Sequence, residues 1–308
     1  MTASFIHLHV HSEYSLVDGI VRIKPLVKAM AGANIPAIAI TDQCNLFAMV
    51  KFYRAAMNAG IKPIVGVDLW VHNKADANQP FRLVLLCQSH QGYLNLSRLV
   101  SRSYIEGQHR GVPIIQRHWL EGKSEGLIAL SGGCAGDVGK ALLTGAPGQS
   151  EACLEQWLQL FGDRFYLELQ RAGREGEESY IHAAVDLAIQ KGVPVVATND
   201  VLFLKSDDFL AHEARVCIQE GRTLDDPRRA RRFTNQQYLR TPEEMTALFE
   251  DIPEALENSV EIAQRCNLEL ELGRNFLPKF PTPKGMSVAD YLHAEAHEGL
   301  KQRLQQIL

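Results

Sequence analysis

The sequence lacks the features of several protein classes. No apolar run approaches the length of about 20 residues that a transmembrane helix needs, and the N-terminus has no basic region followed by an apolar signal core. The six cysteines include no Cys-x-x-Cys pair, which argues against a zinc ribbon and against a disulfide framework. We therefore expect a cytoplasmic protein with no membrane partner.

The chain also lacks an excess of positive charge, internal repeats and low-complexity segments. Its formal net charge is −4, with 32 Lys and Arg against 36 Asp and Glu. A charge of this sign gives no global attraction to nucleic acid, so any contact with DNA must come from a local patch. With 308 residues, 46% of them hydrophobic, the chain can bury one large core and a small appendage.

Short β-rich runs alternate with amphipathic helical segments over the first 200 residues. Strands are expected at residues 5–10, 37–41, 63–70, 81–87, 126–130, 165–169 and 194–197. Helices are expected at 45–58, 91–105, 150–161 and 177–191, and then at 207–220, 242–250 and 252–267. Strand–helix units in series predict parallel strands with right-handed crossovers, which at this length favour a closed α/β barrel.

The most informative stretch lies near the N-terminus and reads Phe5-Ile-His-Leu-His-Val-His-Ser. In an extended strand, side chains two residues apart point to the same side, so His9 and His11 share one face with His7. Two imidazoles that converge at a strand end are suited to holding a divalent metal ion. The alternative is a strand with polar residues on its solvent face.

Other polar residues recur where the predicted strands begin or end. Asp42 ends the second strand, Asp68 lies in the third and Arg82 enters the fourth, while Cys134 and Asp200 follow the fifth and the seventh. The C-terminal ends of parallel barrel strands share one rim, where active sites form. The spacing of these residues therefore predicts a site at that rim.

Seven motifs carry a resemblance to a known family. They are His-Leu-His-Val-His-Ser-x-Tyr-Ser-Leu-Val-Asp-Gly (7–19), Ala-Ile-Thr-Asp (39–42), Lys-Pro-Ile-Val-Gly-Val-Asp (62–68), Leu-Ser-Gly-Gly (130–133), Phe-Tyr-Leu-Glu-Leu (165–169), Val-Val-Ala-Thr-Asn-Asp (195–200) and Phe-Leu-Pro-Lys-Phe-Pro (276–281). In this order they resemble the polymerase-and-histidinol-phosphatase (PHP) domain at the N-terminus of bacterial replicative DNA polymerase III alpha subunits. The resemblance implies a distorted (β/α)7 barrel with C-terminal helices.

The resemblance also implies a set of rim positions that hold up to three metal ions in active members of the family. The matching positions here are His9, His11, Asp18, Gln43, Asp68, Arg82, Cys134, Asp200 and Leu202. The family prefers histidine where Gln43, Arg82 and Leu202 stand, so a degenerate site is expected. At most one zinc or manganese ion is expected, weakly bound, through His9, His11, Asp68 and Asp200.

The role of Arg82 stays open between three interpretations. Its guanidinium cannot donate a lone pair to a metal, but it could relieve repulsion among the carboxylates that converge at the rim. It could also simply pair with any nearby carboxylate, or hold a phosphate or a DNA end. A second basic cluster, Asp225–Phe233, could touch a DNA backbone, although pairing with neighbouring acidic residues is the favoured interpretation.

Two functions follow from the resemblance. In the first, a degenerate metallophosphoesterase domain serves DNA replication as a scaffold of the polymerase and as the docking surface of the separate proofreading exonuclease subunit. In the alternative, it is a residual metal-dependent phosphoesterase, acting as a 3′–5′ exonuclease or a pyrophosphatase. Phosphodiester hydrolysis by clustered metals depends on two ions, so the three absent histidines favour the first. DNA is expected to bind weakly at most.

Three parts are expected along the chain. Residues 1–270 form the barrel domain with its helical C-terminal part, and residues 271–286, which hold prolines and glycines, form an extended linker. Residues 287–308 have the pattern of one amphipathic helix with Ser287 as its N-cap. In the family the polymerase palm follows, so this helix is expected to begin it. The palm's paired catalytic aspartates are not in this sequence.

Overall fold

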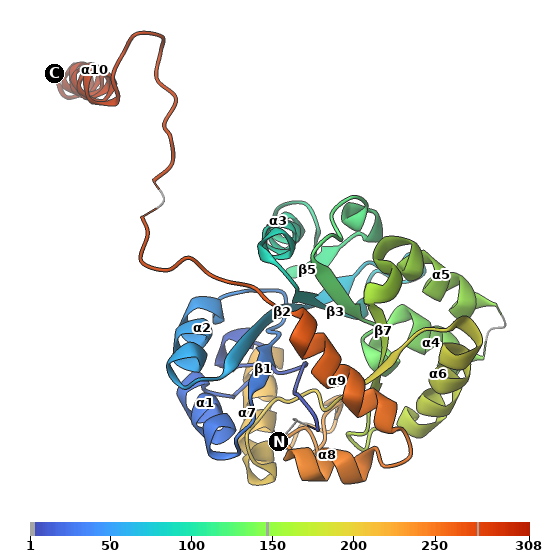
Figure 1. The fold of residues 1–308 in the computed structure, drawn as a ribbon. Helices are drawn as coiled ribbons and strands as arrows, with labels where there is room; N and C mark the ends of the chain where they lie inside the picture. The colour runs from blue at the N-terminus through green and yellow to red at the C-terminus, as the bar shows by residue number, and fades with distance from the viewer. Residues whose placement is uncertain (1–3, 146–147, 276) are drawn as a thin grey trace. The chain divides into compact units, whose positions relative to one another are not determined.

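The computed structural model describes residues 4–145, 148–275 and 277–308, and the chain divides into two compact units, Met1–Glu269 and Leu270–Leu308. The first unit is a distorted (β/α)7 barrel, with helices around its strands (Figure 1). This confirms the expected fold class. Phe276, which begins the seventh motif, lies outside the described residues.

The main strands of the barrel lie where the sequence predicts them. They are β1 (Ala37–Ile40), β2 (Lys62–Val71), β3 (Phe81–Cys87), β6 (Leu127–Leu130), β7 (Phe165–Gln170) and β8 (Val195–Thr198), each hydrogen-bonded to the next in this order. A short hairpin of β4 (Gln108–His109) and β5 (Val112–Ile115) joins the end of β2. This hairpin was not singled out from the sequence.

The N-terminal segment completes the ring between β1 and the residues that follow β8. On one side, Ala39 N donates to His7 O at 2.9 Å; on the other, Val201 N donates to His9 O at 3.0 Å. The prediction of a regular strand at 5–10 is wrong, because this segment makes only isolated bridges. The reason is local: Val10 N donates to the side-chain Oγ1 of Thr41 at 2.9 Å instead of to a backbone oxygen.

The prediction that all barrel strands run parallel is also wrong. Strand β3 is antiparallel to both of its neighbours, β2 and β6. A parallel pair needs a crossover connection, usually a helix, but residues 72–80 contain no helix, so the chain turns straight back. As a consequence, the first residues of β3 lie at the same rim as the last residues of the parallel strands.

Helices cover the outside of the barrel. They are α1 (Ile23–Gly32), α2 (Met49–Asn58), α3 (His90–Ile105), α4 (Asp137–Thr144), α5 (Gln149–Phe161), α6 (Glu177–Lys191), α7 (Phe209–Glu220), α8 (Pro242–Leu248) and α9 (Pro253–Arg265). The core contains the alternate apolar residues of the N-terminal segment, Ile6, Leu8 and Val10, which pack with residues of β1, β3 and β6. The residues between them, which include His9, therefore face away from this core.

The second unit consists of extended chain followed by helix α10 (Val288–Ile307). The side chain of Ser287 accepts a hydrogen bond from Asp290 N at 3.1 Å, so the expected N-cap is confirmed. Across the described residues, no helix is both long and apolar enough to cross a membrane. All six cysteines are free thiols.

We predict that Thr41→Val destabilises the barrel by about 1–3 kcal/mol, because it leaves the buried N–H of Val10 without an acceptor. Urea unfolding measures the effect. Thr246→Val is the matched control, since the hydroxyl of Thr246 bonds only to an exposed carbonyl of its own helix. Equal stabilities of Thr41→Val and the control would show that the N-terminal segment does not need this bond.

Candidate metal centre

The N-terminal segment brings His9 and His11 to the rim of the barrel. Both imidazoles are buried, with exposed fractions of 1% and 0%, and their ring centroids lie 5.4 Å apart. His7, the third member of the expected face, does not join them. Its Nε2 lies 2.8 Å from Arg240 O, and burial lowers the pKa of His7 to about 4, so it is a neutral core residue.

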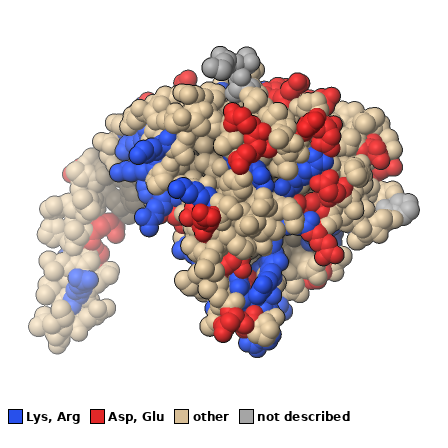
Figure 2. Space-filling model, turned by 90° about the horizontal axis from the view of Figure 1, so that it is seen from below, with Lys and Arg blue, Asp and Glu red and all other residues tan. Residues whose placement is uncertain are grey.

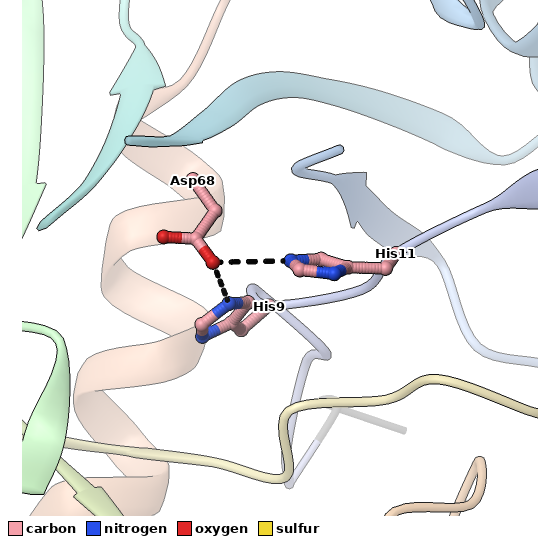
Figure 3. A group of neighbouring side chains, drawn as sticks. All are labelled: His9, His11 and Asp68. Carbon is pink, nitrogen blue, oxygen red and sulfur yellow. Dashed lines mark ion pairs between the residues drawn. The ribbon is translucent and has the colours of Figure 1, made fainter. Parts of the chain in front are cut away.

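Asp68 of β2 meets both imidazoles (Figure 3). Its Oδ2 lies 3.5 Å from Nε2 of His9 and 3.2 Å from Nε2 of His11. One ligand atom from each of these residues lies within 4.8 Å of the other two, close enough for all of them to hold one metal ion. The other carboxylate oxygen, Oδ1 of Asp68, is buried and has no hydrogen-bond partner among the described residues. These donor atoms fit a divalent metal.

The guanidinium of Arg82 lies among the same atoms. In the antiparallel register, Asp68 faces Val84 and Trp70 faces Arg82. Arg82 is therefore the diagonal neighbour of Asp68 on one face of the sheet, within reach of a long side chain. Its Nε donates to Oδ2 of Asp68 at 2.8 Å, and its Nη2 contacts the same oxygen.

The same guanidinium reaches two further predicted ligands. Nη1 of Arg82 donates to Oδ2 of Asp200 at 3.2 Å, and Nη2 lies 3.1 Å from Nε2 of His9. Arg82 thus contacts three of the four residues expected to bind one metal. It brings a fixed positive charge to the place where that metal would lie.

The charges of this cluster are strongly coupled. Burial would raise the pKa of Asp68, but Arg82 and both histidines outweigh it and hold that pKa well below its usual range. Burial alone would lower the pKa of His9, but the carboxylates of Glu168 and Asp200 outweigh it and raise the pKa of His9 to about 9. The Asp68 carboxylate is therefore ionised.

The other expected rim residues are placed unequally. Oδ1 of Asp18 lies 2.9 Å from Nδ1 of His11 and accepts from Ser15 Oγ at 2.9 Å, so this carboxylate orients the imidazole. Gln43 bridges to Asp68 through its backbone, and its side-chain Nε2 is unpaired among the described residues. Cys134 follows β6, and burial raises the pKa of its thiol to about 11. Leu202 is completely buried and has no donor atom.

Asp42, at the end of β1, fixes the turn after the histidines. Its Oδ1 accepts from Ser12 N at 2.6 Å, and its Oδ2 accepts from Ser12 Oγ at 2.8 Å. Burial raises the pKa of Asp42 to about 6, although the Ser12 hydrogen bonds oppose this rise. Asp42 therefore supports the backbone that carries His11.

Sequence reasoning missed Glu168 of β7. This fully buried carboxylate lies 2.7 Å from Nδ1 of His9 and accepts from Thr198 Oγ1 at 2.5 Å and from Gln170 Nε2 at 3.0 Å. A carboxylate on the far nitrogen of an imidazole fixes its tautomer and orientation, as it does for metal-bound histidine. The available signal was an acidic residue inside the apolar run Phe-Tyr-Leu-Glu-Leu.

A second missed residue is Arg174, in the loop after β7. Its Nη1 donates to Oδ2 of Asp200 at 3.1 Å, and its Nε donates to Oε1 of Glu177 at 2.7 Å. Asp200 therefore lies between two guanidinium groups, those of Arg82 and Arg174. No pattern in the sequence distinguished Arg174 from other loop arginines.

The basic cluster Asp225–Phe233 is largely paired within the fold. Arg228 bonds to Asp226, Arg229 to Glu213 and Arg232 to Glu220. This agrees with the favoured interpretation of internal pairing. Most of the positive charge of this cluster is already balanced by acidic groups of the barrel domain.

Comparisons with known proteins find one matching family and several similar chains. A family model for the PHP domain matches residues 7–172. The chain is similar to the DNA polymerase III subunit alpha of Pseudomonas aeruginosa, 54% identical over 308 residues, and to that of Escherichia coli (strain K12), 53% identical over 300 residues. These matches cover 100% and 97% of this chain, but it spans only 26% of the length of either relative.

Two solved structures share more distant similarity. A protein of Bifidobacterium adolescentis assigned as a metal-dependent phosphoesterase has a TM-score of 0.46 and 11% identity, over 63% of this chain and 86% of that one. An amidohydrolase from Chromobacterium violaceum has a TM-score of 0.43 and 14% identity, over 68% of this chain and 96% of that one.

We predict that Arg82→Leu lowers the free energy of unfolding by about 3–5 kcal/mol, because it leaves the buried carboxylates of Asp68 and Asp200 without their shared cation. Arg98→Leu, at an exposed position of α3, is the control and should change it by less than about 0.5 kcal/mol. Urea unfolding of both variants decides the matter. A decrease below about 1 kcal/mol for Arg82→Leu would mean that the cluster does not depend on this guanidinium.

Proposed function

Because this chain belongs to the PHP domain family, we propose that it is the PHP domain of a replicative DNA polymerase III alpha subunit, with its metal site converted into an ion-pair cluster. High identity to such subunits along nearly the whole chain supports this assignment. Polymerisation would belong to the remainder of the longer protein, since the palm's paired aspartates are not in this sequence. The second unit, Leu270–Leu308, would carry the linker and the first helix of the palm.

One observation carries the proposal: the guanidinium of Arg82 bonds to Asp68 and Asp200 and lies against His9. A metal ion would have to displace a buried, ion-paired cation before it could reach these donors. Arg82 itself has no lone pair to donate, and the side chain of Leu202 has no donor atom. The chain's own cation thus takes the electrostatic role of a metal.

A residual metal site is part of the proposal. His9, His11, Asp68 and Asp200 would hold one zinc or manganese ion weakly, and such an ion would act there as a Lewis acid toward a phosphoester oxygen. Glu168 and Asp18 would keep the two imidazoles oriented. Hydrolysis by clustered metals requires two ions, and Arg82 stands where a second set of donors is needed.

The role that fits a disabled site in an intact barrel is structural. We assign to this domain the function of a scaffold within the polymerase and of a docking surface for the proofreading exonuclease subunit. Support comes from the resemblance and from the contrast between the complete hydrophobic core and the altered rim. A residual phosphoesterase, acting as a 3′–5′ exonuclease or a pyrophosphatase, is the alternative. It is favoured by the retained convergence of His9, His11 and Asp68.

We expect the parent to bind at most one equivalent of zinc or manganese. We predict that Gln43→His, Arg82→His and Leu202→His together raise the bound metal above one equivalent. Each change supplies an imidazole at a rim position, and Arg82→His also removes the competing cation. Elemental analysis of the purified protein measures the gain. The melting temperature should then rise on addition of metal, because a ligand of the native state stabilises it.

If the triple variant folds poorly, the single variants Arg82→His and Arg82→Gln separate the effect of removing the guanidinium from the effect of adding a metal donor. Both remove the competing guanidinium, so both should bind more metal than the parent, but only the first adds a donor, so Arg82→His should bind more than Arg82→Gln. Equal metal content in the parent, in Arg82→His and in the folded triple variant would contradict the degenerate-site assignment. Hydrolysis of a single-stranded DNA 3′ end by the unaltered parent would instead support the residual phosphoesterase.

We also predict binding of the proofreading exonuclease subunit by residues 1–308 in titration calorimetry. Because docking would use the barrel and not the metal donors, Arg82→His should bind the subunit as tightly as the parent does. Serum albumin is the control titrant. If the folded protein does not bind the folded exonuclease subunit, the docking function is contradicted and only the scaffold role remains.

A further inference from the structure

The charges of this chain are distributed unevenly. Residues 19–62 contain six Lys and Arg residues and a single acidic residue, although the whole chain has a net charge of −4. That acidic residue, Asp42, is 1% exposed and bonded to Ser12. The surface formed by this stretch therefore presents positive charge with no acidic side chain of its own.

Four of the positive residues lie on two neighbouring helices outside the barrel, α1 and α2 (Figure 1), and Arg22 is the N-cap of α1. Lys24 and Lys28 are one helical turn apart on α1, and Lys51 and Arg54 are one turn apart on α2; all are exposed. We define the α1–α2 basic face as Arg22, Lys24, Lys28, Lys51 and Arg54. Lys62 is not part of it, because its Nζ donates to Ala263 O at 2.7 Å and to Asn267 Oδ1 at 2.8 Å.

Most of this charge is unpaired. Lys51 lies 3.3 Å from Oε1 of Glu13. For the other four residues of the face, the structure gives no ion pair with any described residue. The arginines of the cluster 222–232 differ, since most of them bond to acidic side chains. Figure 2 shows Lys and Arg side chains gathered at several places on this side of the molecule, one of them at the left.

Four unpaired cations on adjacent helices raise the local potential enough to attract a polyanion, even when the net charge is negative. The proposed function supplies one, because a polymerase subunit works beside DNA. Binding to the DNA backbone by exposed Lys and Arg is driven by counterion release, and it is independent of sequence and weakened by salt. Such a contact needs exposed Lys and Arg side chains without acidic partners, and the α1–α2 basic face provides them.

We propose that the α1–α2 basic face binds the sugar-phosphate backbone of duplex DNA. This inference rests on the proposed function for the identity of its partner, but it uses none of the metal-centre residues. The contact would be weak, sequence-independent and local to this side of the barrel. It would hold the duplex against the domain while the remainder of the longer protein acts on it.

Fluorescence anisotropy with a fluorescein-labelled duplex, titrated with residues 1–308 at several salt concentrations, tests the proposal. The triple variant Lys24→Gln, Lys28→Gln, Arg54→Gln should bind at least about tenfold more weakly than the parent at low salt. Its slope of log affinity against log salt should be smaller by about 2.7, or about 0.9 for each of the three cations removed. All three side chains are exposed, so the variant should keep the parent's melting temperature.

The matched control is Arg228→Gln, Arg231→Gln, Arg232→Gln, which removes the same charge from the other basic cluster and should change the affinity by less than about twofold. Equal binding by the parent and the α1–α2 variant would overturn the proposal, and so would absence of parent binding at low salt or a weakening confined to the control. The metal content of the same preparations tests the proposed function separately, because neither triple variant touches the metal centre.

Discussion

The barrel depends on a cation for the carboxylates buried at its rim. Asp68 and Asp200 are both almost completely buried, and two ionised carboxylates in such surroundings would repel each other and lose their hydration. The guanidinium of Arg82 bonds to both of them and offsets that cost. The rest of the cluster follows from this interaction: His9 is held between Glu168 and the ion pair, and Asp18 orients His11 from the other side.

Geometry decides which residue supplies that cation. If β3 ran parallel to its neighbours, its first residues would lie at the opposite end of the barrel from the last residues of β8. The short connection before β3 reverses the strand and places its start beside the end of β2. The reversal of β3 and the length of the Arg82 side chain thus act together, because a long charged side chain that enters β3 reaches the middle of the rim.

Most strands of the barrel and several residues of the rim were predictable from the sequence. The predictions that failed did so for physical reasons. The alternation of apolar residues with His9 and His11 predicts which face of the N-terminal segment meets the core, because that rule is local. Glu168 and Arg174 were missed because their roles depend on the pairing of β7 with β8 and on a loop conformation. The role of Arg82 stayed open because the direction of β3 sets its distance from Asp68. The irregular first strand escaped prediction because a side chain, that of Thr41, replaces a backbone partner.

The N-terminal segment has a consequence for the order of folding. It completes the ring by bonding to Val201. During synthesis this bond cannot form until about 190 later residues have been made. Contacts of such long sequence separation slow folding, because the entropy of loop closure is lost before the contacts form. Until then, Ile6, Leu8 and Val10 stay exposed on the nascent chain. The rim that contains His9 and His11 therefore cannot be complete before Val201 has been synthesised.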